Sequence, residues 1–591
     1  MENRADIIFK NVKVYNSYFK SFHLADVSVL DGKIYYIDRE QSGQLTADEE
    51  IDASGSYMIP GLVDVHMHIE SSMMTPKIFC DQLASCGVTT IVSEPHEMAN
   101  VNGIRGILDM IDAGESCAVD IFYGIPSCVP STSEELETTG GIIDCQAMKR
   151  LLENERIICV GEIMNYRQII KENELEIGKF LAYLKKINSN LVIEGHCPDL
   201  VNLDLAKFLY LGINGDHTEH DIEEIRQRFE NGMYVELQEK MVSREILEFI
   251  EKHGLYEYFG FVTDDVMADT LFEEGQLDHV VRKAIQLGMP PEQAIYNATY
   301  TNARRMNLLD RGVLAPGKKA DFVLVENPES LKVTATYKDG QCIYQQESNL
   351  EHMRKNDAPC GQAQAKHSFG TEYYHSIQLE KMPLDRFQIP VEGEADQVTV
   401  RVMEVCDGST KTKEQYMTLP VVNGFLQWEN SECRLAIVAE RYGKEGSIGY
   451  GLVCGDIIKT GAVATSYAHD SHNLLVVGAT AREMQLAANR VIELQGGIVT
   501  AGNEKVTAEL PLQVGGILSE QPIEEISRDL KRVREEMIRQ GYCHYNPIMS
   551  LCTLTLPVSP KLKLTNKGLV NVGEGKIVPL IPSGQHTNRL P

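Results

Sequence analysis

Histidines and carboxylates follow several short apolar runs of this sequence, and both residue types bind metal ions. His66 and His68 close the run that begins at Leu62. Alternate side chains of an extended strand point the same way, so this His-x-His pair can hold one ion. Residues of the same kind come at or just after other apolar runs: His96, Glu97, Glu162, His196, His217 and Asp264.

Each of these residues has an ordinary explanation when taken alone. A histidine at the end of a strand is more often a hydrogen-bonded structural residue, Glu162 can be a surface carboxylate, and Asp264 can cap the following helix. Buried together, however, they are costly unless a cation compensates them. Four histidines, one glutamate and one aspartate suit two divalent cations with a bridging carboxylate: His66, His68, His196, His217, Glu162 and Asp264.

The elements that position these residues form an alternating pattern between residues 59 and 311. Amphipathic stretches such as 223–230 and 244–253 separate short β-like runs. We expect strands at 61–65, 89–92, 120–124, 157–160, 191–193, 212–214, 233–235 and 259–262. Such alternation predicts a (β/α)8 TIM barrel, whose active site is built at the carboxyl ends of its strands, and an open doubly wound sheet is the alternative.

Further domains flank the predicted barrel. Asp-Gly turns at 31–32 and 339–340 indicate hairpins, so residues 1–58 and 312–346 are expected to form one discontinuous β-sandwich domain. Residues 347–372 are predicted to be a linker, and 373–591 a C-terminal α/β domain. Within this last domain we expect a strand at 474–477 and a helix at 482–494.

Composition restricts the partners of the protein. The 591 residues carry a formal net charge of −29, which repels nucleic acid. Neither a membrane span nor a signal peptide is visible. The 14 cysteines include no Cys-x-x-Cys pair, which indicates reduced thiols in a cytoplasm and no common structural zinc site. A small-molecule substrate and a cytoplasmic location are therefore expected, and the exposed small β domain favours a homodimer.

Several motifs resemble those of one family. The run 59–68, IPGLVDVHMH, resembles the metal motif that opens the amidohydrolase barrel. Across the whole chain the sequence is similar to the bacterial adenine deaminase family, in HIESSM (68–73), EPHEMANV (94–101), SCVPST (127–132), VGEIMN (160–165), GDH (215–217), TDD (263–265) and AHDSHN (468–473).

This resemblance implies a metal centre with defined roles. His66, His68 and Asp264 would hold one ion, and His196 and His217 a second. Glu162 would bridge the two ions, since a carboxylate has two oxygens. The ions implied are divalent, with Mn2+ as the first choice and Fe2+ or Zn2+ as alternatives.

The resemblance also implies purine chemistry: hydrolysis of adenine to hypoxanthine and ammonia, by a metal-activated hydroxide that attacks C6. Asp264 would transfer protons, and Glu239 or Glu97 would protonate a ring nitrogen. The expected pocket or supporting residues are His96, Asp265, His469, Asp470 and His472. The C-terminal domain either caps the barrel mouth or forms an interdomain hydrogen-bond network.

The sequence departs from the family pattern in three segments beside the predicted site. These are 237–241 and 266–268, after strands seven and eight, and 197–200, after His196. They leave open a divergent member that acts on another purine or on a cyclic amide or ureide, or that is catalytically silent. A glutamate at position 162, where ureide hydrolases commonly use lysine, argues against the ureide alternative. No Pro-Cys-x-x-Cys is present, which excludes the cytidine deaminase type.

Overall fold

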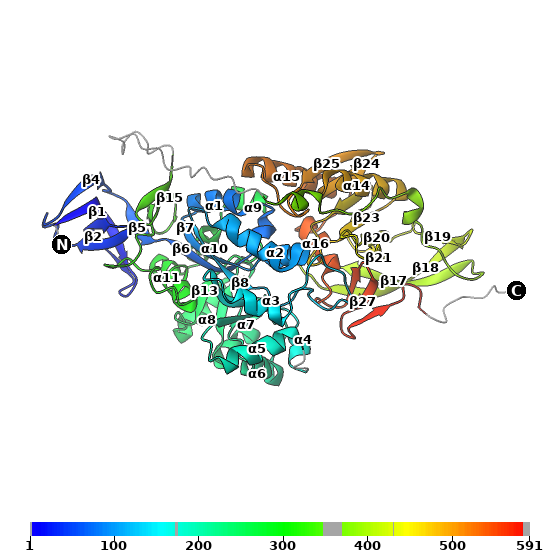
Figure 1. Ribbon diagram of the computed structural model, residues 1–591, viewed down its shortest axis with the longest axis horizontal. Helices are drawn as coiled ribbons and strands as arrows, with labels where there is room; N and C mark the ends of the chain where they lie inside the picture. The colour runs from blue at the N-terminus through cyan, green and yellow to red at the C-terminus, as the bar shows by residue number, and fades with distance from the viewer. Residues whose placement is uncertain (1–2, 172–174, 347–368, 430, 583–591) are drawn as a thin grey trace.

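The computed structural model describes residues 3–171, 175–346, 369–429 and 431–582. Three regions follow one another along the long axis of the molecule: a small β sheet that contains the N-terminus, a barrel, and a C-terminal domain (Figure 1). Most of the linker predicted at 347–372 lies outside the described residues.

The small sheet joins the start of the chain to strands that follow the barrel. Its eight strands form one hydrogen-bonded sheet in which β14 pairs with β5, rather than two separate sheets. Both predicted hairpins are present, and Asp31 and Gly32, like Asp339 and Gly340, have positive φ angles, as a type I′ turn requires. The strands are β1 Arg4–Asn16, β2 Ser21–Leu30, β3 Lys33–Asp38, β4 Thr46–Asp52, β5 Tyr57–Pro60, β14 Phe322–Val325, β15 Val333–Lys338 and β16 Gln341–Gln345.

The predicted barrel is confirmed. Eight parallel strands pair in chain order from β6 to β13, and a parallel bridge between Met67 and Asp264 brings the two end strands together. The strands are β6 Leu62–Met67, β7 Val88–Ser93, β8 Asp120–Ile125, β9 Ile157–Ile163, β10 Val192–Gly195, β11 Gly215–Asp216, β12 Tyr234–Leu237 and β13 Phe259–Phe261.

Helices follow the barrel strands, and their sequences explain their bounds. In α8, Ser243 caps the first turn by accepting from the Ile246 amide, and Gly254 ends the helix at a φ of 64°. The barrel helices are α1 Pro76–Ser85, α2 His96–Gly114, α3 Cys145–Leu151, α4 Tyr166–Ile169, α5 Glu176–Lys186, α6 Asn202–Tyr210, α7 Ile222–Glu230, α8 Arg244–His253, α9 Ala268–Glu274, α10 Leu277–Gln286, α11 Pro291–Asn297 and α12 Tyr300–Arg305.

One strand prediction is wrong in position. Strand six was expected at 212–214, but β11 is Gly215–Asp216. Gly212 has a φ of 108° and lies in the turn that follows α6, so only from Asn214 onward does the chain hydrogen-bond to its neighbours, at Ile193 and Tyr234.

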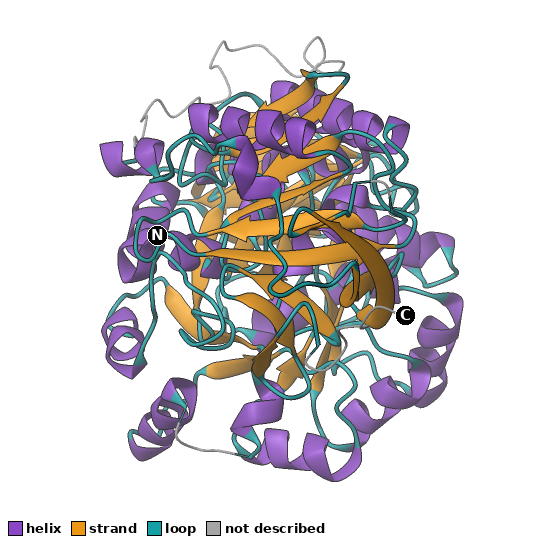
Figure 2. Ribbon diagram, turned by 90° about the vertical axis from the view of Figure 1, so that its right-hand side faces the viewer, coloured by secondary structure: helices purple, strands orange, loops and turns teal. Residues whose placement is uncertain are grey.

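The C-terminal domain is built on a nine-stranded sheet in the order β19-β18-β17-β21-β20-β23-β22-β24-β25. Figure 2 shows its long strands with helices along one side. The strand and helix expected at 474–477 and 482–494 are present as β23 and α14. The elements are β17 Gln397–Val405, β18 Thr412–Val422, β19 Phe425–Leu426, β20 Arg434–Ala439, β21 Ile448–Cys454, β22 Ala462–Thr465, β23 Leu474–Gly478, α14 Ala481–Leu494, β24 Gly497–Gly502, β25 Lys505–Pro511, α15 Ile523–Arg539, α16 Pro547–Cys552, β26 Leu562–Thr565, β27 Gly568–Asn571 and β28 Lys576–Val578.

The barrel and the C-terminal domain share one hydrophobic core. A single cluster of buried side chains includes Met73 and Met98 of the barrel together with Tyr467 and Val514 of the C-terminal domain. Burial of apolar area is the main favourable term in packing, so this shared core holds the two domains in a fixed relation. Any side chain at their boundary is therefore positioned by both.

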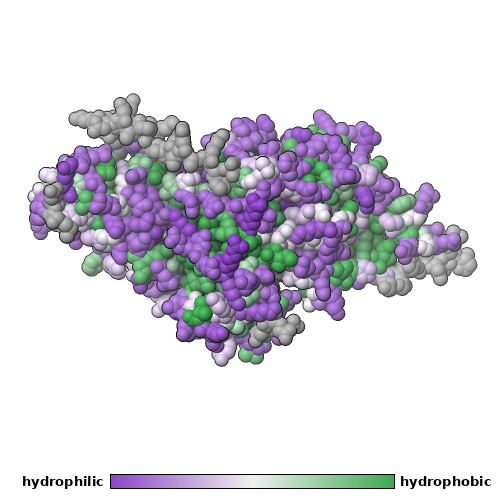
Figure 3. Space-filling model, in the orientation of Figure 1, coloured by the Kyte–Doolittle hydropathy of each residue, from purple (hydrophilic) through white to green (hydrophobic). Residues whose placement is uncertain are grey.

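The outer surface is largely hydrophilic on the face shown in Figure 3. Among the described residues, no helix combines the length and the apolar character that crossing a membrane requires. No two cysteines of the described ranges are joined by a disulfide.

Candidate metal centre

The six predicted ligands meet at the carboxyl end of the barrel strands. His66 lies near the end of β6 and His68 directly follows it, while Glu162 is the last but one residue of β9. The other three come directly after β10, after β11 and shortly after β13: His196, His217 and Asp264. Parallel strands that close into a barrel bring these ends to one mouth, which explains how residues 198 positions apart come into contact.

The first ligand group consists of His66, His68 and Asp264. Asp264 Oδ1 lies 3.7 Å from His66 Nε2 and 3.5 Å from His68 Nε2. Asp264 adopts a φ of 59°, in the left-handed region that aspartate tolerates better than most residues, and its amide donates to the His66 carbonyl. The backbone therefore directs this carboxylate towards the two imidazoles.

The second group is arranged around Glu162. Its Oε2 lies 2.5 Å from His196 Nδ1 and 3.2 Å from His217 Nε2, whereas its Oε1 faces His68 Nε2 at 3.5 Å. The two oxygens of one carboxylate thus face ligands of both groups, as a bridging ligand must. Burial raises the pKa of Glu162, but His196 and His217 outweigh it and hold the pKa well below its usual value.

The donor set fits divalent cations. His66 Nε2 and His217 Nδ1 are buried and have no hydrogen-bond partner. Three donor atoms of His66, Glu162 and His217 converge within 4.8 Å, as do three of His66, His68 and Asp264. Imidazole and carboxylate donors at this spacing suit Mn2+, Fe2+ or Zn2+.

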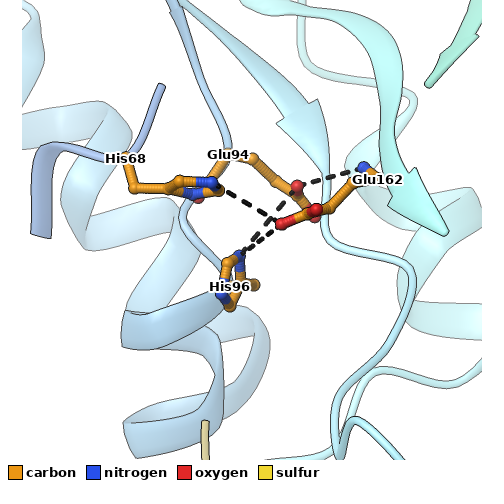
Figure 4. Close-up of side chains that lie close together, drawn as sticks. All are labelled: His68, Glu94, His96 and Glu162. Atoms are coloured by element: carbon orange, nitrogen blue, oxygen red, sulfur yellow. Dashed lines mark hydrogen bonds and ion pairs between the residues drawn. The ribbon is translucent and has the colours of Figure 1, made fainter. Parts of the chain in front are cut away.

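Glu94 belongs to the site, although the sequence analysis did not single it out. Its Oε2 accepts from the Glu162 amide at 3.0 Å and lies 4.0 Å from His96 Nδ1, and it forms a buried group with His68, His96 and Glu162 (Figure 4). Burial, followed by the charge of Glu162, raises the pKa of Glu94 to about 8. Its position immediately after β7 is the signal that would have identified it.

Four of the five expected pocket or supporting residues gather around Glu97. Glu97 Oε1 lies 2.6 Å from His469 Nδ1 and 3.6 Å from His96 Nε2, and His472 Nε2 donates to its Oε2. Asp470 Oδ1 lies 3.7 Å from His469 Nδ1. The fifth, Asp265, instead accepts a hydrogen bond from Ser71 Oγ. The C-terminal domain therefore contributes side chains next to the metal centre.

Glu239 lies apart from this cluster. It follows β12 at the same end of the barrel, is 40% exposed and forms an ion pair with Lys283. Within the described ranges it makes no ion pair with the histidines of the metal centre. Glu97 and Glu239 were both predicted to protonate a ring nitrogen, but the structure places them in different surroundings.

Comparison with known proteins identifies both large domains. An amidohydrolase family model matches residues 57–343, and a model of the adenine deaminase C-terminal domain matches 409–576. An adenine deaminase of Clostridium perfringens is 45% identical over 582 residues, which cover 98% of this chain and 100% of the relative. Adenine deaminase 2 of Shouchella clausii is 45% identical over 576 residues, 97% of this chain and 98% of its own.

Among solved structures, a β-aspartyl dipeptidase from Fervidobacterium islandicum matches with a TM-score of 0.45 at 19% identity, covering 60% of this chain and 100% of the dipeptidase. N-acetylglucosamine-6-phosphate deacetylase from Thermotoga maritima matches with a TM-score of 0.43 at 18% identity, covering 57% and 100%.

Proposed function

The chain belongs to the adenine deaminase family, and we propose that its barrel site hydrolyses adenine to hypoxanthine and ammonia. In this reaction the oxygen of water bonds to C6 of the purine and the C6–N bond to the exocyclic amine breaks. The observation that carries the proposal is the position of Glu162, whose two oxygens face histidines of both ligand groups. It supports a hydrolytic centre with two ions in a chain whose relatives are named for adenine deamination.

We assign the metal ligands in the two groups that the family resemblance implies. His66, His68 and Asp264 would hold one ion, His196 and His217 would hold the other, and Glu162, whose two oxygens face both groups, would serve both. When bound, divalent cations lower the pKa of water towards neutrality, which is the chemistry they supply here. Mn2+ is our first choice of ion.

Asp264 is the proton carrier in this proposal. Its side chain is 17% exposed, whereas that of Glu162 is 4% exposed, so of these two carboxylates Asp264 is the more open to a substrate. Burial raises the pKa of Asp264, but the neighbouring imidazoles of His66, His68 and His217 hold it well below its usual value. Asp264 is therefore an anion that can accept a proton from water and pass it to the departing amine.

The ring nitrogen needs a different donor. Burial raises the pKa of Glu97, but His469, His472 and His96 hold it well below its usual value, so Glu97 is present as the anion. We assign Glu97 to orient the histidines around it, and we keep Glu239 as the candidate for proton transfer to the ring nitrogen because it is partly exposed at the same end of the barrel. Since Glu239 is ion-paired with Lys283, it must first take up the proton that it passes on. The neighbouring Lys283 donates to the backbone carbonyl of Glu239 and to its Oε1, which keeps the Glu239 side chain oriented.

Location and assembly remain expectations from the sequence. We propose that the protein works in the cytoplasm, which suits a sequence with 14 scattered cysteines and no Cys-x-x-Cys pair, and that it forms a homodimer. The purine would be the free base, since the strongly negative net charge disfavours a nucleic-acid substrate.

The direct test is turnover of free adenine by purified protein loaded with Mn2+. The ultraviolet spectrum of adenine is expected to convert to that of hypoxanthine, with one ammonia released for each adenine consumed. Turnover of dihydrouracil or hydantoin without turnover of adenine would replace the proposal with a cyclic amide hydrolase. If protein fully loaded with Mn2+ converts neither adenine nor a cyclic amide, the chain is a catalytically silent member of the family.

A further inference from the structure

A second cluster of metal-binding side chains lies on the boundary between the barrel and the C-terminal domain. His96 and Glu97 are the first two residues of α2 in the barrel, and His469 and Asp470 lie in the loop between β22 and β23. All four are buried, with Glu97 1% and Asp470 2% exposed. We call these four residues the junction cluster.

The donor atoms of the junction cluster converge on one point. His96 Nε2 lies 3.6 Å from Glu97 Oε1 and 4.0 Å from Asp470 Oδ1, and the three residues offer donor atoms that all lie within 4.8 Å of one another. Nitrogen and oxygen ligands sit roughly 2.0–2.2 Å from a transition ion, so donors of one ion lie about 3–4 Å apart. The separations found here leave room for one cation between the domains.

The negative charge of the junction cluster is not balanced by basic residues with fixed charge. Among the described residues, no lysine or arginine forms an ion pair with Glu97 or Asp470. Asp470 Oδ2 is buried without a hydrogen-bond partner, and Glu97 Oε1 is contacted only by histidine nitrogens. Buried carboxylates with unsatisfied oxygens are costly unless a cation compensates them.

We propose that the junction cluster binds a further divalent transition-metal ion, held by His96 Nε2, Glu97 and Asp470. An imidazole donor among the ligands favours Mn2+, Fe2+ or Zn2+ over Ca2+ or Mg2+. His469 Nδ1, 2.6 Å from Glu97 Oε1, stands beside the ion and orients this carboxylate. Because its ligands come from both domains, the ion would link the C-terminal domain to the mouth of the barrel.

His96 connects this ion to the metal centre. While its Nε2 faces the junction cluster, its Nδ1 lies 3.8 Å from Glu162 Oε1 and 4.0 Å from Glu94 Oε2. One imidazole ring thus has a nitrogen directed at each site. Occupation of the junction site would fix the orientation of His96 beside the bridging glutamate.

Metal content and anomalous diffraction test the proposal on the full-length protein, without reference to catalysis. After loading with Mn2+ and dialysis, the wild-type chain is expected to retain about one equivalent of manganese more than Asp470→Asn. The matched control Asp81→Asn, which alters an exposed carboxylate on α1, should retain the wild-type content. Crystals of the wild-type protein should show an anomalous peak between His96, Glu97 and Asp470.

The competing explanation is that protonated histidines neutralise the junction cluster. In that case Asp470→Asn retains the wild-type content and no anomalous peak lies between the domains, and the inference is overturned. If Asp470→Asn does not fold, the anomalous map of the wild-type crystal decides alone. A peak in a protein that fails to deaminate adenine would sustain this inference and refute only the proposed function.

Discussion

Glu97 of the barrel and His472 of the C-terminal domain are hydrogen-bonded to each other, Oε2 to Nε2, inside the buried boundary between the two domains. The bond holds a residue that directly follows His96, which in turn contacts Glu162 of the metal centre. Arg441 fixes His472 from the other side by donating through Nε to its backbone carbonyl. The C-terminal domain is therefore a structural part of the active site.

Replacing His472 should weaken the attachment of the C-terminal domain to the barrel. In His472→Ala the buried Oε2 of Glu97 loses its donor, which costs about 2–4 kcal/mol and lowers the temperature of thermal unfolding. We expect kcat/KM for adenine to fall at least about tenfold, because His96 loses its support. His375→Ala, at an exposed histidine of the same domain, is the control and should match the wild type. If His472→Ala unfolds at the wild-type temperature and keeps the wild-type kcat/KM, the C-terminal domain does not support the metal centre through this bond.

Replacing Asp264 should remove proton transfer. Asp264→Asn keeps the size of the side chain but cannot accept the proton, so kcat should fall by about 10³ at saturating Mn2+. Steady-state kinetics with the metal content measured on the same sample separate this effect from metal loss. A decrease in kcat of less than tenfold would assign proton transfer to another group.

The role of Glu239 can be separated from that of its ion pair. If Glu239 protonates the ring, Glu239→Gln should lower kcat by about 10² while KM changes little. Lys283→Met, which removes only the partner, should reduce kcat far less. Equal effects of the two substitutions would show that the ion pair serves structure alone.

Asp120 should matter for stability and not for chemistry. It begins β8, at the end of the barrel opposite the site, and contacts Arg311, Lys319 and Lys338 of the returning chain. We expect Asp120→Asn to lower the free energy of unfolding by about 2 kcal/mol at pH 7, because it removes a charged partner that these cations share, although each of them keeps another carboxylate. Adenine turnover at 25 °C should stay at the wild-type value.

The pH dependence of this effect follows from the pKa of Asp120. Burial raises that pKa, but Lys338, Arg311 and Lys319 lower it far below the value in the unfolded chain. At acidic pH the folded state then binds fewer protons than the unfolded chain. The stabilisation is therefore complete above the unfolded pKa of about 3.9, and it is lost as the pH falls towards the pKa of Asp120 in the folded protein. Denaturation profiles of wild type and Asp120→Asn should therefore converge below about pH 4. A constant difference down to pH 2 would contradict this linkage.

Much of the barrel, and the convergence of the candidate ligands at one of its ends, can be predicted from the sequence because both depend on local periodicity. Short apolar runs that alternate with amphipathic stretches place the strands, and the carboxyl ends of those strands place His66 and Glu162 on one mouth. The exception is strand six, where Gly212 and Ile213 extend the apolar pattern into a turn. Apolar character alone does not show where pairing with neighbouring strands begins.

The contacts across the domain boundary could not be predicted in this way. Glu97 and His472 are 375 positions apart, and their contact depends on how two independently patterned domains dock. The sequence indicates the polar motif 468–473 but does not show which barrel residue it meets. Likewise, Glu239 and Glu97 are both carboxylates that follow strands, and only the structure shows that one is partly exposed and the other buried among histidines.

The most direct test of this account is the titration of metal-free protein with Mn2+ while adenine turnover is followed. We expect no conversion of adenine without metal and turnover that rises with the amount of bound Mn2+, while Glu162→Gln stays inactive throughout. The proposed ligands of these ions are His66, His68, Glu162, His196, His217 and Asp264. Conversion of adenine by the metal-free protein, or wild-type turnover by Glu162→Gln, would contradict this account.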